Sequence, residues 1–168
     1  MNRLPVEITE GERLALGTDE LIVLATTEQT GGALFSALIR MPPGGGPPVL
    51  HRHAPGEIYH VLEGEFVFYV GDKDRPDGPV RRHPVRAGEV MPLAGDTPHT
   101  IRNESDADAV AFMVHAPGAA MEGFSRAAAA LAAAGEPSME AVLEIAATHG
   151  IELLGPVVVA TDAAAAPS

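Results

Sequence analysis

Short apolar runs separated by glycine and proline constrain this chain more than any other feature of its sequence. Between Glu20 and Gly118, runs rich in Val, Ile, Leu and Phe alternate with turn-forming segments such as Pro42 to Pro48. Runs of this length and spacing are typical of strands in a sandwich or barrel, so we predict an all-β fold. The predicted strands are Leu21–Thr27, Ala33–Met41, Val49–His53, Ile58–Leu62, Phe66–Val70, Glu89–Leu93, His99–Asn103 and Val110–His115.

The sequence changes character after Pro117. The alanine-rich segment Ala119–Ala134 has helical periodicity and is followed by Gly135, which predicts a helix. A second helix is predicted to begin after Ser138 as its N-cap and to end at Gly150. We expect this C-terminal pair of short helices to cover an outer face of the β structure.

A chain of 168 residues is long enough for one domain with a substantial core. We therefore predict a single domain over residues 1–168, with a barrel at about 10–118 and helices at about 119–150. The tail at 156–168 is rich in small residues, so we expect it to be flexible.

Charge and cysteine content exclude several classes of function. Eleven basic against 23 acidic residues give a net charge of -12, which disfavours binding to nucleic acid or to anionic membranes. The chain has no cysteine, so any metal must be bound by nitrogen and oxygen atoms. The N-terminal segment lacks the apolar run of a signal peptide, and no run is long enough to span a membrane, so a cytoplasmic location is predicted.

Histidine and glutamate cluster in a pattern that suits a metal ion. His51, His53 and Glu57 share one parity, so on an extended backbone their side chains leave the same face. Two histidines and one carboxylate bind divalent ions and leave coordination positions open. His99, from a distant strand, is the natural fourth ligand.

The glycines around these residues complete two recognisable motifs. Gly45-x5-His51-x-His53-x3-Glu57-x6-Gly64 resembles the first motif of the cupin family, and the segment from 88 to 103 resembles the second. The second motif departs from the usual P-x-G-x-x-H spacing, because here it reads Pro92-x-x-Gly95-x-x-x-His99. Over about residues 10–156 the chain resembles the quercetin-dioxygenase-like cupins with a single domain.

This resemblance implies a fold and a cofactor. The fold would be a double-stranded β-helix, the jelly-roll barrel of cupins. The cofactor would be one divalent metal ion, which could be Fe, Mn, Ni, Co, Cu or Zn, bound by His51, His53, Glu57 and His99. A cupin that has lost its metal, with structural histidines at these positions, is the alternative.

Other residues are candidates for the substrate pocket or for packing. Tyr59 shares the parity of the ligands and could contact a substrate, whereas His60 is expected on the opposite face. His115 ends the last strand, where it could act as a proton shuttle or simply be solvated. An apolar pocket above the metal could be lined by Tyr59, Phe35, Phe66, Phe68, Met91 and Phe112.

One predicted strand carries apolar side chains on both faces. Val67 and Tyr69 alternate with Phe66 and Phe68, so a monomeric barrel would leave one of these faces exposed. This pattern favours a homodimer.

The cluster admits three classes of function. The resemblance implies a dioxygenase of the quercetinase type that acts on a small aromatic or enolic, flavonol-like molecule, with Glu57 as both ligand and general base. The first alternative is a metal-dependent isomerase, epimerase or decarboxylase of a sugar or keto acid. The second is a cupin that binds a small molecule without turnover.

Overall fold

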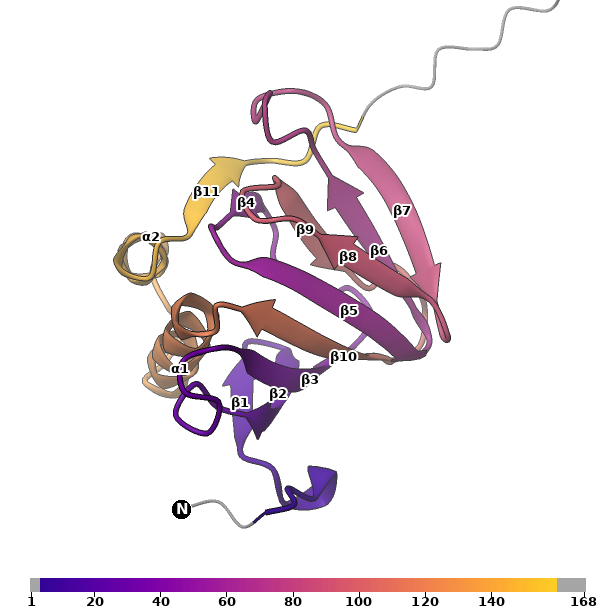
Figure 1. Cartoon of the computed structure of the whole chain (residues 1–168). Helices are drawn as coiled ribbons and strands as arrows, with labels where there is room; N and C mark the ends of the chain where they lie inside the picture. The colour runs from indigo at the N-terminus through magenta and orange to yellow at the C-terminus, as the bar shows by residue number, and fades with distance from the viewer. Residues whose placement is uncertain (1–3, 160–168) are drawn as a thin grey trace, which may run out of the picture.

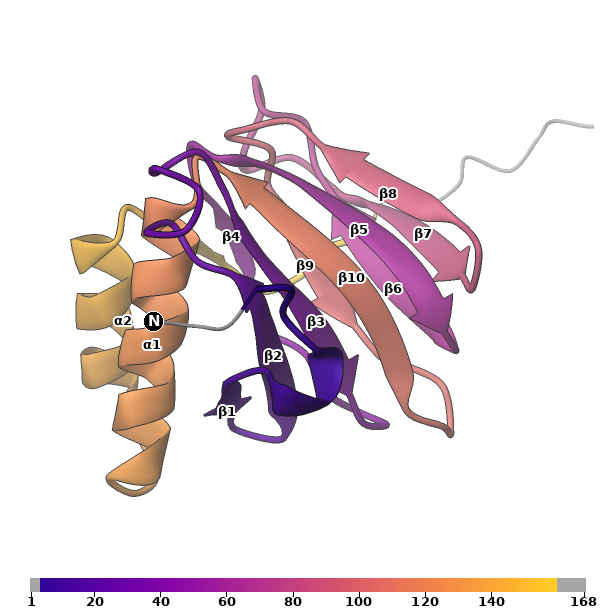
Figure 2. The same ribbon diagram turned by 60° about the horizontal axis from the view of Figure 1, so that its bottom comes forward.

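Two antiparallel β-sheets face each other in the computed structural model, which describes residues 4–159 (Figure 1). One sheet has the strand order β1-β2-β3-β10-β5-β8 and the other has the order β11-β4-β9-β6-β7. Figure 2 shows the same strands from below. The strands are β1 (Arg13–Leu16), β2 (Asp19–Ala25), β3 (Phe35–Met41), β4 (Leu50–Arg52), β5 (Gly56–Glu63), β6 (Glu65–Val70), β7 (Arg81–Arg86), β8 (Val90–Leu93), β9 (His99–Arg102), β10 (Ala109–Ala116) and β11 (Glu152–Gly155).

The predicted all-β fold is confirmed, and each of the eight predicted strands is present within a few residues of its expected bounds. Sequence reasoning missed β1, β7 and β11, and all three are edge strands with a single neighbour. An edge strand needs less apolar surface than a central one, and charged residues and proline are common there. Strand β7 illustrates this, since it contains three arginines and Pro84 and buries only Val85.

Alternation along the central strands places the core between the sheets. In β5 the side chains of Tyr59 and Val61 are buried, whereas the intervening His60 is exposed as predicted. Strand β10 pairs with β5 and buries Ala111 and Met113 on the same side. The inward-facing residues form one continuous apolar cluster that includes Phe35, Phe66 and Phe68, so the barrel interior is packed rather than hollow.

A second, smaller core lies on the outer face of the five-stranded sheet. Val67 and Tyr69 are buried there with Leu50 and Val80, and Leu154 and Val157 pack against them. The expectation that a monomer would leave this face exposed is therefore wrong, because the C-terminal segment of the same chain covers it. The exposed face therefore no longer supports a homodimer, which stays a prediction.

The C-terminal segment is ordered further than the sequence indicated. Val80 donates a backbone hydrogen bond to Val158 and forms an isolated parallel bridge with Val159. Residues 156–159, the start of the predicted flexible tail, thus lie beside Val80, and the flexibility of the tail stays a prediction. Its remainder, residues 160–168, lies outside the described residues.

Both predicted helices are present and lie side by side on one flank of the barrel (Figures 1 and 2). Helix α1 (Ala119–Ala133) packs against β1 and β3, and α2 (Met139–Thr148) packs against α1 and β11. Ser138 caps α2 as predicted, because its side chain accepts a hydrogen bond from Ala141. Within residues 4–159 no helix is long and apolar enough to cross a membrane.

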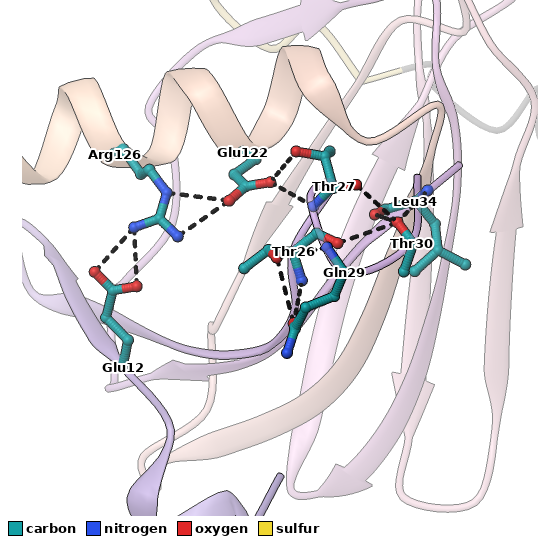
Figure 3. A network of polar contacts seen from close by, with 8 residues as sticks. All are labelled: Glu12, Thr26, Thr27, Gln29, Thr30, Leu34, Glu122 and Arg126. Carbon is teal, nitrogen blue, oxygen red and sulfur yellow. Dashed lines mark hydrogen bonds and ion pairs between the residues drawn. The ribbon is translucent and has the colours of Figure 1, made fainter. Parts of the chain in front are cut away.

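A chain of polar contacts attaches α1 to the N-terminal strands (Figure 3). Oε2 of Glu122 accepts hydrogen bonds from the backbone N–H of Thr27 at 2.7 Å and from its hydroxyl at 2.6 Å. Oε1 of Glu122 accepts from Arg126, which also donates to both carboxylate oxygens of Glu12. These contacts fix the start of α1 against the loop that follows β2.

Two motif positions show why particular residues are needed. Gly64 joins β5 to β6 with φ of +71°, and a Cβ there would lie 2.8 Å from the carbonyl oxygen of Asp108. Asn103 is fully buried and donates from Nδ2 to the carbonyl oxygens of Met41 at 2.8 Å and Ala107 at 2.7 Å. Both residues therefore hold turns at the end of the barrel away from the histidines.

We expect Glu122→Ala to destabilise the protein by about 1–3 kcal/mol, because it leaves the Thr27 donors and one side of Arg126 without a partner. Glu122→Gln keeps one acceptor oxygen and should cost less. Urea unfolding measures both, with Glu144→Ala on the exposed face of α2 as the matched control. Equal stabilities for Glu122→Ala and the control would contradict the assignment.

Asp19 gives a prediction about pH. Burial raises the pKa of its carboxyl from 3.8 to about 6, even though Gly46 donates a backbone hydrogen bond to Oδ2, which lowers it. Between these two values the folded state holds a proton that the unfolded state has lost, so this group lowers stability as pH rises through the window. Asp19→Asn does not titrate, so its stability relative to wild type should increase from about pH 4 to about pH 7. Urea unfolding at both values tests this, and a constant difference would refute it.

Candidate metal centre

The four predicted ligands meet at one end of the barrel because of strand register. His51 in β4 pairs directly with His99 in β9. His53 follows β4, and Glu57 is the second residue of β5, beside β10. The segment from His51 to Glu57 and the distant start of β9 thus bring their side chains to a common point.

The turn before His99 accommodates the unusual spacing of the second motif. Asp96 adopts a left-handed conformation there with φ of 63°, and its backbone N–H donates to the carbonyl oxygen of His53 at 2.8 Å. Gly95 lies so close to Ala54 that a Cβ would come within 2.1 Å of the Ala54 carbonyl oxygen. The two ligand-bearing loops are therefore packed backbone to backbone.

Backbone carbonyl groups fix which nitrogen of each imidazole faces the centre. Nδ1 of His53 lies 3.0 Å from the carbonyl oxygen of Pro55, and Nδ1 of His99 lies 2.8 Å from that of Thr97. A carbonyl oxygen only accepts, so each Nδ1 carries a proton, and in the neutral imidazole each Nε2 presents a lone pair. Metal-binding histidines typically have this arrangement. Burial acts to lower the pKa of His99, but Glu57 outweighs it and raises that pKa.

The inward nitrogens lie close to the carboxylate of Glu57. Nε2 of His99 is 2.5 Å from Oε1, and Nε2 of His53 is 3.6 Å from Oε2. These three residues are at most 7% exposed, and the two Nε2 atoms and Oε1 have no hydrogen-bond partner within residues 4–159. Lone pairs this close to a carboxylate need positive charge between them. One proton satisfies a single pair, whereas a metal ion satisfies all of them, so the donor set fits a cation.

His51 completes this set from the more open side. Its ring centroid lies 4.5 Å from that of His99 and 6.0 Å from that of His53, and the three histidines offer nitrogens within 4.8 Å of one another. Although the residue as a whole is only partly buried, burial of its ring lowers the pKa to about 3. His51 is therefore neutral and able to coordinate at neutral pH.

Charge at the centre is set by Glu57. Burial acts to raise the pKa of this carboxyl, but His99 and His115 beside it outweigh burial and hold the pKa well below its usual value. Burial also lowers the pKa of His53. The result is one ionised carboxylate among imidazoles, which suits a divalent ion of the first transition series.

His115 is the residue whose position the sequence did not define. It is 1% exposed, and its Nε2 contacts Oε2 of Glu57. His53, Glu57 and His115 form a second group of close donor atoms. In the structure the alternation of β10 turns His115 inward with Ala111 and Met113, and the pairing of His115 with Glu57 across β10 and β5 produces the contact. Solvation at the end of the strand is therefore the wrong alternative for His115.

The six predicted pocket residues fall into three groups. Tyr59 lies at the centre, where its hydroxyl donates to Oε2 of Glu57 at 3.3 Å. Phe35, Phe66 and Phe68 are fully buried in the apolar core, and Met91 packs against it from a partly buried position. The structure does not bring Phe112 to the site, because it pairs with the exposed His60 and so points to the outer face.

A hollow of about 500 Å³ opens beside His53. It lies on the outer side of the ligand loops and is reached by the start of β11. Its lining is mainly charged and consists of Arg52, Lys73, Asp74, Asp96 and Glu152, together with His53, Ala54 and Gly150. A surface of this kind suits a small polar molecule better than a large aromatic one.

Comparisons with known proteins agree with the fold and the motifs. Residues 37–115 match the family model described as "Cupin domain". A crystal structure of a predicted oxalate decarboxylase from Thermotoga maritima is similar, with 26% identity, a TM-score of 0.57, and coverage of 67% of this chain and 98% of that one. No protein of curated function matches the sequence.

Two further structures share the fold at lower identity. The oxalate decarboxylase of Bacillus subtilis is 18% identical with a TM-score of 0.57, and the match covers 70% of this chain but 30% of that one. A sugar phosphate isomerase of the cupin superfamily from Silicibacter pomeroyi is 22% identical with a TM-score of 0.53, covering 66% and 74%. The two facing sheets and these structures agree on the fold, and residues 37–115 match the cupin domain model.

Proposed function

We propose that this chain is an enzyme that uses one divalent metal ion, bound by His51, His53, Glu57 and His99, to act on a small polar acid. The reaction class is decarboxylation or isomerisation of a keto acid or sugar acid. This choice of substrate rests on the polar hollow beside His53, because the barrel interior is already filled by side chains. The identity of the metal stays open among Fe, Mn, Ni, Co, Cu and Zn.

The size of the available space argues for a small substrate. Phe35, Phe66 and Phe68 have no exposed surface. These aromatic residues, which were expected to line a pocket, are instead packed in the apolar core. A flavonol would need these side chains to move apart. A small polar molecule needs only the hollow, whose lining carries both signs of charge: Lys73 and the Arg52–Glu152 ion pair lie there with Asp74 and Asp96.

The residues around the centre have distinct roles in this proposal. A bound divalent ion would supply positive charge that lowers the pKa of a substrate oxygen. Glu57 would hold the ion and also take or return a proton, since its carboxylate is ionised and lies among the converging donors. The similar structure named as a predicted oxalate decarboxylase supports this reaction class through the common fold.

Dioxygenase activity on an enolic or flavonol-like substrate stays the second candidate. The same donor set leaves coordination positions for oxygen, and the hydroxyl of Tyr59 at the centre suits an enolic oxygen. A barrel that binds a small molecule without turnover is the third reading. The cytoplasmic location and the homodimer also stay predictions.

Metal content tests the ligand set. Protein purified without added metal or chelator should contain about one equivalent of a divalent ion, because the two groups of close donors share His53 and so describe one site. His51→Ala and His99→Ala should each lose most of it. His60→Ala, at an exposed histidine of β5, is the matched control and should keep it. Elemental analysis decides, and equal metal content in all four proteins would disprove the assignment.

Oxygen uptake and product analysis separate the two enzymatic candidates. With keto acids and small dicarboxylates we expect release of carbon dioxide or isomerised product without net oxygen consumption. Glu57→Gln should abolish turnover while it retains part of the metal, since the amide oxygen still coordinates but does not accept a proton at neutral pH. Stoichiometric oxygen uptake with flavonols would instead favour the dioxygenase.

A further inference from the structure

We propose that His115 is a positioning residue which holds Oε2 of Glu57, so that Glu57 offers only Oε1 to the metal ion. The inference rests on the proposed metal centre and adds the coordination mode of its single carboxylate. It begins from the contact between Nε2 of His115 and Oε2, deep in the barrel.

The tautomer of His115 differs from that of the ligands. His53 and His99 each direct Nδ1 to a backbone carbonyl oxygen, which leaves Nε2 as a lone pair. Neither ring nitrogen of His115 has a hydrogen-bond partner of regular geometry within the described part of the chain, although Nε2 contacts Oε2 of Glu57. Nothing therefore commits its proton to Nδ1, and the adjacent carboxylate favours the tautomer with the proton on Nε2. His115 is thus set up as a donor to Glu57, whereas the ligands are set up as acceptors of a cation.

The location of His115 also separates it from the ligand group. His51, His53 and His99 form one cluster of nitrogens within 4.8 Å, and His115 is not part of it. His115 joins only the group of His53 and Glu57. Its ring centroid lies 5.8 Å from that of His53 and 6.1 Å from the ring of Tyr59. His115 is therefore grouped with Glu57 and His53, whereas His51 and His99 belong to the other group.

Tyr59 acts on the same oxygen. Its hydroxyl donates to Oε2 of Glu57 at 3.3 Å, so two donors from neighbouring strands contact one carboxylate oxygen. The other oxygen, Oε1, has no hydrogen-bond partner within residues 4–159 and lies 2.5 Å from Nε2 of His99. This division assigns one oxygen to hydrogen bonds and the other to the ion. It keeps Glu57 monodentate and preserves an open coordination position for substrate.

Cobalt(II) binding to the metal-depleted full chain tests the proposal, with visible absorption as the reporter of coordination geometry. His115→Ala should still bind one equivalent of cobalt, with an altered spectrum and an affinity about ten- to a hundredfold weaker. His115→Gln retains an N–H donor and should restore most of the wild-type spectrum. Tyr59→Phe removes the second donor without changing the ring, and it should shift the spectrum in the same direction to a smaller extent.

Each outcome has one meaning. Unchanged spectra and affinities in His115→Ala and Tyr59→Phe would overturn the positioning role and leave the metal centre intact. Loss of stoichiometric binding in His115→Ala, to the level of His51→Ala, would make His115 a ligand and also overturn it. Absence of cobalt binding by the wild-type chain would overturn the proposed function itself. If His115→Ala does not fold, the cobalt spectra and affinities of Tyr59→Phe and His115→Gln are compared with those of the wild-type chain instead.

Discussion

A buried carboxylate that faces imidazole lone pairs is the interaction on which the rest of this molecule depends. The carbonyl oxygens of Pro55 and Thr97 accept the Nδ1 protons of His53 and His99. A neutral imidazole held in this way has no N–H left to donate to the carboxylate of Glu57. Burial makes such an arrangement costly unless a cation enters it. The strands hold these groups together at one end of the barrel.

The barrel converts this local arrangement into a site with two distinct sides. Pairing of β4 with β9 and of β5 with β10 brings donors from both sheets to one end. Inside, aromatic side chains fill the space up to Tyr59, which excludes water from one side of the carboxylate. Outside, the charged hollow lies beside His53. The fold therefore separates the residues that tune Glu57 from the surface that a substrate would reach.

The sequence predicted more of the site than of its surroundings. Alternation and motif spacing were sufficient to bring together His51, His53, Glu57 and His99, because each lies on or next to a regular strand. His115 was undecided, since its contact depends on a pairing between β10 and β5 that spacing does not reveal. The covering of Val67 was missed for a related reason: short polar edge strands such as β11 carry little periodic signal.

Strand β11 has a consequence for the order of events during biosynthesis. The ligand strand β4 meets β9 through the single pair of His51 and His99, and most of its pairing is with β11. Arg52 and Glu152, which join these two strands by an ion pair, are 100 residues apart. A nascent chain on the ribosome therefore presents both histidine loops well before the strand that braces them exists.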